Sequence, residues 1–425
     1  MLIWILICVL FLWLSYAANR DFASPVFISG TIWLGVYFIL FFTQENDAFI
    51  SFYYGVFAAA FICFFLGFFF TRPRYTERRN KIQYQIKWNK RFYKVIVIIA
   101  YFFVALCLLN SWEYITARTG SIWMAVRRST FEIEPLLGTI IGLLQNIIPV
   151  AFFVSFGMWL CNPIKTNRNA VFFLIPPLFM VLLLSNRGDW FYIIITTALM
   201  VIYIKKPSNQ TIVKVGITGV IAILIIFIIS SFDKFSNAWT NLDKFDKLSK
   251  FFEGYFEGPP IAFIEWLENE IEHANGAYTF RFLYAVFNKI FTEIEVVDTV
   301  QPFITVNGIS TNVYTSLQWY AHDFGIAWVF VVEIFLGIFY GKIYKNIRKY
   351  QPSLFSIILL SMLLYPIVNQ FFDDKIFSIF SIWIQRIFWL YLFTKTRLCI
   401  REYACVQNKS VLGKYRITIR GRIIL

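Results

Sequence analysis

The feature that most constrains this chain is a series of long apolar runs separated by short polar gaps. Inside a bilayer every backbone N–H and C=O group has to be bonded within the chain, so apolar runs of about 20 residues predict membrane-spanning α-helices. A mean hydropathy of +0.63 agrees with this interpretation. The chain is predicted to be an all-α, polytopic transmembrane helix bundle with about 11 spans. We place these spans at residues 2–18, 25–42, 48–70, 93–110, 136–160, 170–184, 190–204, 211–231, 325–343, 354–371 and 376–394.

Lysine and arginine concentrate in alternate gaps between these runs. Cytoplasmic loops of membrane proteins are enriched in both residues. If every second gap is cytoplasmic, that side holds 27 of the 39 basic residues. The distribution predicts an outside N-terminus and an inside C-terminus, and it explains the net charge of +14 without a nucleic acid partner. The segments assigned to the cytoplasm are Arg20 and residues 72–94, 162–169, 205–214, 342–349 and 395–425.

Four regions follow from this topology. Residues 1–231 hold spans one to eight, 232–324 form a large external (periplasmic) loop, 325–394 hold spans nine to eleven, and 395–425 form a basic cytoplasmic tail. A loop of this length is usually either functional or disordered. This one is rich in aromatic residues, which disfavours disorder, so a functional loop is expected. Within it, "GPPIAFIEWLENEIEHANG" predicts an amphipathic helix that starts at its prolines and stops at Asn275-Gly276. That helix is expected to lie on the bilayer surface or to pack over the bundle.

Several arginines lie where the enrichment of cytoplasmic loops does not explain them. A charge within the hydrocarbon region costs at least about 2.5–3.5 kcal/mol, so such residues need a reason. A guanidinium group binds phosphate through two parallel hydrogen bonds and stays protonated when it is desolvated. Arginines that converge near the outer leaflet would therefore form a site for the diphosphate of a lipid. The candidates are Arg118, Arg127, Arg128, Arg187 and Arg281 near the predicted outer face, and Arg386 within the last predicted span.

The stretch "SNRGDW" (185–190) breaks two apolar runs with three polar or flexible residues. Gly188 is expected to allow a tight turn between two helices, with Arg187 pointing into a polar cavity. The alternative is a short exposed loop in which Arg187 pairs with Asp189. The local sequence leaves both interpretations open.

The stretch "STNVYTSLQWYAHDFG" (310–325) predicts a short helix that leads into a span. Ser310 or Thr311 would cap it, and Gly325 would end it. One face of this helix would be polar, and it ends in a histidine beside a carboxylate. This makes His322 a candidate general base. The structural alternative is that Asp323 caps a helix or pairs with an arginine while His322 faces water. The predicted polar face consists of Asn312, Thr315, Ser316, Trp319, His322 and Asp323.

With these residues the chain resembles the oligosaccharide repeat-unit polymerases of bacterial envelopes, the Wzy-type O-antigen and capsular polysaccharide polymerases. Four stretches carry the resemblance: "DFASPVFISG" (21–30), "SNRGDW" (185–190), "GAYTFRFLY" (276–284) and "TNVYTSLQWYAHDFG" (311–325). A second glycine often follows the last stretch in that family, whereas Ala327-Trp328 stand here. The resemblance implies a membrane glycosyltransferase with a type C glycosyltransferase-like fold.

The activity that the resemblance implies is the joining of undecaprenyl-diphosphate-linked oligosaccharide repeat units at the outer face of the bacterial plasma (inner) membrane. The growing chain is the donor, and a sugar hydroxyl of the incoming unit is the acceptor. The product would be the O-antigen of lipopolysaccharide or a capsule. Besides the lipid-linked substrate and the bilayer, the family implies a chain-length regulator protein as a partner.

The resemblance and the chemistry together assign roles to candidate residues. Arg187 and Arg281 are expected to bind the diphosphate, with Arg127 and Arg128 in support. His322, or Asp323 if the histidine only orients, would take the acceptor proton. Asn312 is expected to contact substrate. Trp319 is expected to stack on a sugar ring or to anchor the protein at the membrane interface.

No D-x-D nucleotide-sugar motif stands in the external segments, and no His/Cys cluster suggests zinc. We therefore expect no bound metal and no cofactor, and we interpret Asp373-Asp374 as a solvated turn. Two other functions remain open. One is an O-antigen ligase, which transfers the same kind of donor to lipid A core, and the other is a transporter such as the flippase that supplies the repeat units.

Overall fold

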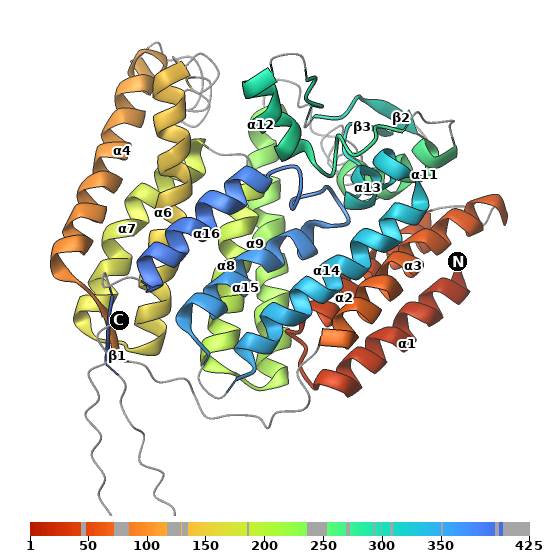
Figure 1. The fold of residues 1–425 in the computed structure, drawn as a ribbon, viewed down its shortest axis with the longest axis horizontal. Coiled ribbons are helices and arrows are strands. Elements are labelled where there is room, and N and C mark those ends of the chain that lie inside the picture. Colours follow the sequence, from red (N-terminus) through yellow and green to blue (C-terminus); the bar gives the residue numbers. More distant parts are fainter. Residues whose placement is uncertain are drawn as a thin grey trace, which may run out of the picture. The chain divides into compact units, whose positions relative to one another are not determined.

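The computed structural model is helical, with two small two-stranded sheets in its described part (Figure 1). It describes residues 1–43, 48–71, 85–116, 129, 135–184, 187–235, 253–268, 273–291, 294–298, 300–306, 309–349, 352–395 and 399–402. The helices are α1 (Leu2–Asn19), α2 (Pro25–Thr43), α3 (Ala48–Thr71), α4 (Lys90–Thr116), α6 (Pro135–Cys161), α7 (Lys165–Leu184), α8 (Arg187–Lys205), α9 (Asn209–Phe235), α11 (Gly258–Glu268), α12 (Arg281–Phe291), α13 (Ser316–Phe324), α14 (Ile326–Ile347), α15 (Leu354–Asn369) and α16 (Phe380–Lys395). The strands are β1 (Gln85–Trp88), β2 (Ile304–Val306), β3 (Ile309–Thr311) and β4 (Cys399–Glu402).

Eight of the described helices are long and apolar enough to cross a membrane, namely α1, α2, α3, α4, α6, α7, α8 and α14. Each of the eleven predicted ranges overlaps a helix, which confirms that this is a multi-pass helical membrane protein. Helices α15 and α16 have 16 residues each, fewer than the roughly 20 that a full crossing needs. The number of eleven spans and the orientation stay predictions.

The chain divides into two compact units, and neither is continuous in sequence. Unit 1 comprises residues 1–77, 208–350 and 362–383, and unit 2 comprises residues 78–207, 351–361 and 384–425. Spans far apart along the chain therefore share one core. The four predicted regions are continuous segments defined by topology. The two units are instead groups of segments that pack together, so the regions and the units have different boundaries.

In unit 1, α3 and α14 pack along each other, and small residues bring their backbones close (Figure 1). A β-carbon added at Gly67 would overlap the carbonyl oxygen of Ile334, and one at Gly337 would overlap that of Phe64. Gly337 and Gly341 stand four residues apart, the spacing at which two membrane helices approach closely. This pair of glycines fixes the packing of the helix that follows α13.

Asp21, the first residue of "DFASPVFISG", also has a structural role in unit 1. Its carboxylate accepts hydrogen bonds from the Tyr344 hydroxyl at 2.6 Å, from the Arg348 guanidinium at 3.3 Å and from the Ala23 amide at 2.9 Å. The stretch that contributes to the family resemblance thus joins the start of α2 to the end of α14.

Helix α11 starts at the prolines, as predicted. Its first seven residues are buried, and Phe263 packs against Phe57 of α3 with ring centroids 5.8 Å apart. Of the two predicted positions, the structure supports packing over the bundle. Asn275 and Gly276 have positive φ angles of 49° and 90°, values that do not continue a right-handed helix. The described part of α11 ends earlier, at Glu268, and residues 269–272 lie outside the description.

The predicted start of the helix before α14 is wrong. Residues 309–311 form β3, which pairs antiparallel with β2, and α13 begins only at Ser316 with Thr315 as its N-cap. Ser310 and Thr311 therefore do not cap α13, and Asn312 does not lie on its polar face. The sequence held the missed signal, because β-branched residues flank Asn307-Gly308, a dipeptide typical of β-hairpins.

Unit 2 is built on α4, α6, α7 and α8, with α6 packed most closely on α7. Strand β1 pairs antiparallel with β4, and the indole of Trp88 in β1 donates a hydrogen bond to the Ser155 hydroxyl at 2.9 Å. Helix α7 ends at Leu184 and α8 starts at Arg187. The prediction that Gly188 forms the turn is therefore wrong, since Gly188 lies in the first turn of α8.

Candidate site around helix α13

Helix α13 is a short buried helix held between a hairpin and a span. Leu317, Trp319 and Tyr320 are each at most 1% exposed, so apolar contacts fix the helix in unit 1. It ends at Gly325, whose positive φ of 79° favours glycine and whose N–H donates to the Ala321 carbonyl at 2.8 Å. The predicted break at Gly325 is confirmed. This break directs the last turn of α13, with His322 and Asp323, toward segment 273–281.

Asp323 anchors that segment. Its side chain is fully buried, and its two carboxylate oxygens accept the backbone N–H groups of Tyr278 at 3.0 Å and of Thr279 at 2.6 Å. A carboxylate that accepts amide N–H bonds stabilises the backbone that donates them. Both oxygens of Asp323 are occupied in this way. The structure therefore supports the capping role for Asp323 and favours His322 as the group that is free to act on a proton.

The imidazole of His322 lies against the Tyr278 ring, with centroids 4.3 Å apart and ring planes 21° apart. Trp266 of α11 contacts it too, at a centroid distance of 5.1 Å. Burial lowers the pKa of His322 below its ordinary value of 6.5, and the nearby Asp323 carboxylate opposes this shift. The imidazole is therefore mainly neutral at neutral pH, the state in which it can accept a proton.

Trp319 forms the buried side of the same cluster. It is 1% exposed and meets the Tyr278 ring edge to face, with centroids 5.1 Å apart. An indole buried to this extent packs against its neighbours, and the predicted role of Trp319 in stacking on a sugar or anchoring at the interface stays a prediction. Tyr278, which sequence reasoning did not single out, is the residue that joins His322, Asp323 and Trp319. Its position one turn before Arg281 in "GAYTFRFLY" was the available signal.

Arg281 is the first residue of α12. Its Nε atom donates to the Val297 carbonyl at 2.7 Å, and its backbone N–H donates to the Tyr278 carbonyl at 3.2 Å. The segment that Asp323 holds thus sets the position of Arg281. A guanidinium at the start of a helix combines its own charge with the positive end of the helix dipole, which favours an anionic ligand.

Helix α12 is amphipathic, and none of its residues is buried. Its apolar side chains recur at the spacing of one helix face. In a chain that spans a membrane, such a face is suited to lipid. The exposed side chains are Leu283 (46%), Val286 (39%), Phe287 (45%) and Ile290 (63%).

The structure brings some predicted site residues together and leaves others apart. His322, Asp323, Trp319 and the segment that carries Arg281 form one cluster in unit 1. Asn312 is half-buried in the chain between β3 and α13. Arg127 and Arg128 lie outside the described residues, as does the side chain of Arg187, whose backbone begins α8 in unit 2. The convergence of these arginines with Arg281 stays a prediction.

The charges of "SNRGDW" find a partner in unit 2 that was not predicted. Arg386, 6% exposed, donates to Asp189 at 3.4 Å and to the Asn146 side chain at 3.2 Å, and it lies over the Tyr192 ring at 4.2 Å. Asp189 thus compensates a buried arginine on another helix, as charges inside membrane proteins require. This explains one polar residue of the stretch, and it provides Asp189 with a partner other than Arg187.

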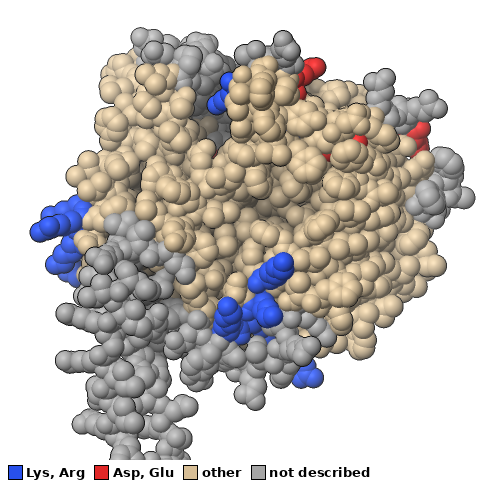
Figure 2. Space-filling view, viewed as in Figure 1, with Lys and Arg blue, Asp and Glu red and all other residues tan. Residues whose placement is uncertain are grey.

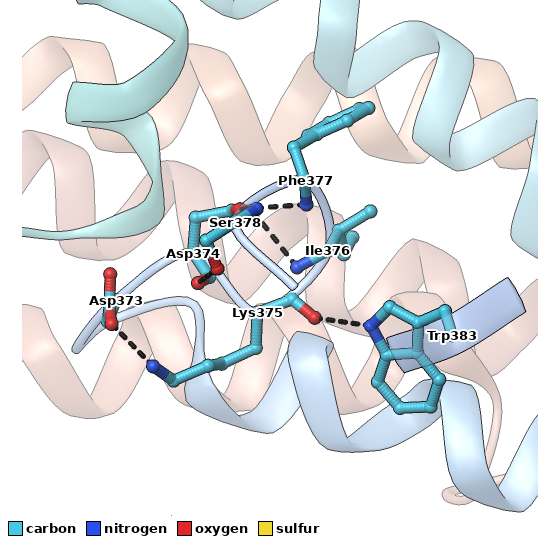
Figure 3. A network of polar contacts seen from close by, with 7 residues as sticks. All are labelled: Asp373, Asp374, Lys375, Ile376, Phe377, Ser378 and Trp383. Atoms are coloured by element: carbon cyan, nitrogen blue, oxygen red, sulfur yellow. Dashed lines mark hydrogen bonds and ion pairs between the residues drawn. The ribbon is translucent and has the colours of Figure 1, made fainter. Parts of the chain in front are cut away.

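The interpretation of Asp373-Asp374 as a solvated turn is wrong for Asp374, which is fully buried. Its side chain accepts the backbone N–H groups of Ile376, Phe377 and Ser378 at 3.2, 2.8 and 2.7 Å, as Figure 3 shows. It also accepts the Tyr320 hydroxyl at 3.0 Å, which joins this loop to α13. Burial raises the pKa of Asp374 to about 6, so the carboxyl is mainly ionised at neutral pH.

The fold is that of a multi-pass helical membrane protein, and aromatic rings of Tyr278, Trp266 and Trp319 surround His322 beside the segment that leads to Arg281. Comparison with protein-family models, with curated proteins and with solved structures found no match to this chain. Within the described ranges, no three His, Cys, Asp or Glu side chains lie close enough together to hold a metal ion.

Proposed function

We propose that this protein is a glycosyltransferase that polymerises undecaprenyl-diphosphate-linked oligosaccharide repeat units into O-antigen or capsular polysaccharide. The reaction takes place at the outer face of the bacterial plasma membrane. The substrate has a polyprenyl chain, a diphosphate and a glycan. Its site therefore needs, in this spatial order, an apolar surface for the chain, a cationic group for the diphosphate and a base near the reacting sugar. The resemblance described above suggests this substrate class.

One observation carries the proposal. A single segment, residues 276–281, touches the candidate base at one end and presents Arg281 at the other. Tyr278 stacks on His322, and three residues later Arg281 begins the exposed apolar helix α12. Base, cation and lipid-facing surface therefore follow one another in the order in which the acceptor hydroxyl, diphosphate and polyprenyl chain require them.

The chemistry needs little more than positioning. The bond between the donor sugar and the diphosphate breaks, the acceptor oxygen forms the new glycosidic bond, and the acceptor proton leaves. Neutral His322 accepts that proton as the carbon–oxygen bond forms. Arg281 and the amino end of α12 stabilise the charge that develops on the departing diphosphate. Holding both lipid-tethered substrates in the plane of one membrane supplies orientation.

Charge placement supports an outward-facing site. Figure 2 shows acidic side chains over the region of α11, β2 and β3, and basic side chains near the carboxyl end of α14. Lys342, Lys345, Arg348 and Lys349 stand at that carboxyl end. Basic residues mark cytoplasmic ends of spans, and this supports an outward position for α13 at the other end of α14.

The purified protein in lipid vesicles, supplied only with the lipid-linked repeat unit, tests the proposal. We expect a ladder of products that differ by one repeat. An O-antigen ligase would yield no product until lipid A core is added. A transporter would move the substrate across the vesicle membrane without lengthening it.

A further inference from the structure

A small cavity lies in unit 1 between the buried side of α13, the first turns of α14 and the chain around the end of α15. Its volume is about 10 Å³, near the minimum that admits one water molecule. The polar residues that line it are Ser316, Tyr320, Glu333, Gln370, Asp374 and Lys375. It is separate from the cluster of His322 and Arg281, and the inference drawn from it does not rest on the proposed function.

Glu333 is the unusual member of this lining. It is the eighth residue of α14, a membrane-spanning helix, and it is only 3% exposed. No hydrogen bond or ion pair to Glu333 is present within the part of the chain that the structure describes. An ionised carboxylate with no donor in an apolar interior is strongly disfavoured, so Glu333 requires a neutralising partner.

The neighbouring cation does not supply it. The ammonium group of Lys375 is bound to the Asp373 carboxylate at 2.6 Å (Figure 3). The second carboxylate at the cavity, Asp374, carries its own negative charge and is held by three backbone N–H groups and the Tyr320 hydroxyl. Two carboxylates thus share one cavity, and only one of them has donors.

The other lining groups offer oxygen atoms. Gln370 uses its side-chain N–H₂ on Ser29, at 2.9 Å to the hydroxyl and 3.3 Å to the carbonyl, which leaves its amide oxygen as the free end. Ser316 and Tyr320 contribute hydroxyl groups. Oxygen donors with carboxylates suit a hard cation, whereas a site of this size excludes an ion that keeps its hydration shell.

We propose that the cavity between Glu333 and Asp374 binds one small monovalent cation, either a proton carried by Glu333 or a sodium ion held by the surrounding oxygens. Either occupant removes the uncompensated charge. The titratable groups that face Glu333 come from each packed element: Cys63 of α3, Tyr320 of α13, Tyr340 of α14, and Asp374 with Lys375 of the loop after α15.

The test measures the thermal unfolding midpoint of the purified full chain in detergent. The buffer contains either sodium or choline at the same ionic strength, and each is used at several pH values between 5.5 and 8. The proteins compared are wild type, Glu333→Gln and the control Glu295→Gln. Glutamine has nearly the shape of glutamate but no charge, and Glu295 is an exposed residue of the same unit. For wild type and the control we expect the occupant to raise the midpoint by roughly 2–5 °C. Glu333→Gln should lose the sodium response and should respond less to acid than the control does, because only the groups other than Glu333 still titrate, and it should melt at or above the occupied wild type.

The two occupants are distinguished by which change raises the midpoint. A rise with sodium at pH 8 identifies the ion, and a rise only with acid identifies the proton. Infrared spectroscopy of wild type checks the proton directly, through the C=O stretch of a buried carboxylic acid, and does not depend on how the variant folds. The proposal is overturned if wild type responds to neither sodium nor acid, or if Glu333→Gln responds as wild type does.

Discussion

The imidazole of His322 and the phenol ring of Tyr278 are stacked, with centroids 4.3 Å apart and planes 21° apart. The residue after His322 binds the same segment, because the Asp323 carboxylate accepts the Tyr278 N–H at 3.0 Å. Two consecutive residues of α13 thus fix the stretch that leads to Arg281. A change in either contact should therefore alter the position of Arg281 as well as that of His322.

If His322 is the base, replacing it should abolish polymerisation without unfolding the protein. We predict that His322→Gln lowers the rate of product formation at least about 100-fold, the lower range for loss of a general base. The control is His273→Gln, which removes the other, exposed histidine and should leave the rate near that of wild type. Full activity of His322→Gln would exclude this role.

The same assignment predicts a pH profile. Burial places the pKa of His322 below 6.5, so the imidazole is neutral above that value and protonated below its folded pKa. The rate should be flat between about pH 7 and 8 and should fall in more acidic buffer. Initial rates across this range, with the length of products recorded, check the expectation. A rate that rises on acidification would contradict it.

Asp323→Asn should mainly lower the stability of the fold around residues 273–281. Asparagine has one acceptor oxygen in place of two and presents an N–H₂ group to a backbone N–H, so one of the two bonds is lost and the other is no longer charge-assisted. We predict destabilisation of about 1.5–3 kcal/mol and faster proteolysis within residues 273–281. The control Asp298→Asn changes an exposed carboxyl of the same unit and should have little effect. A variant that melts like wild type but makes no polymer would instead identify Asp323 as the base.

The exposed face of α12 should contribute to binding of the polyprenyl chain and not to binding of the glycan. Burying a Phe or Ile side chain contributes about 1.5–3 kcal/mol, and every 1.4 kcal/mol is about tenfold in affinity. Phe287→Glu should therefore raise KM at least about tenfold for a substrate with the full polyprenyl chain and little for a short-chain analogue. Asn288→Glu, one residue along the same helix and off the apolar stripe, is the control. Equal effects on both substrates would argue against lipid contact at this face.

The pair of Asp189 and Arg386 predicts an asymmetry in stability. The Arg386 side chain is 7% exposed and that of Asp189 is 36% exposed, so the Asp189 carboxylate can hydrate when Arg386 is replaced, whereas the Arg386 guanidinium stays buried without a carboxylate of this pair when Asp189 is replaced. Loss of one partner of a buried pair costs about 3–5 kcal/mol. Asp189→Leu should therefore melt well below Arg386→Leu, and the double variant should recover part of the loss. The reverse order would show that the pair is not what neutralises Arg386.

Much of the helical framework follows from the sequence because the length of an apolar run is itself a physical requirement of the bilayer. The start of α11 with Pro259 in its first turn and the break at Gly325 are local backbone properties, and the structure confirms them. The helical spacing of polar residues predicts a start of α13 at Ser310 or Thr311, whereas the hairpin sequence Asn307-Gly308 favours the observed pairing of β2 and β3. Helix α8 likewise includes Gly188, since the first turn of a helix tolerates glycine.

Contacts between segments that are distant along the chain could not be predicted from the sequence. Nothing local pairs Asp189 with Arg386 or buries Asp374 against Tyr320, because these pairs lie 197 and 54 residues apart. Glu333 did have a sequence signal, as a lone acidic residue within an apolar run. The role of Tyr278 depends on Asp323 and His322 arriving from another helix, so no pattern in "GAYTFRFLY" alone specifies it.

The most direct test of the central claim compares product ladders from wild type, Arg281→Ala and Lys342→Ala in vesicles that contain only the lipid-linked repeat unit. Lys342 is an exposed basic residue near the carboxyl end of α14, so it controls for loss of one positive charge. We predict ladders of normal length from wild type and Lys342→Ala and none from Arg281→Ala, with equal amounts of folded protein in all three. Normal chain growth by Arg281→Ala would contradict a diphosphate site at the start of α12.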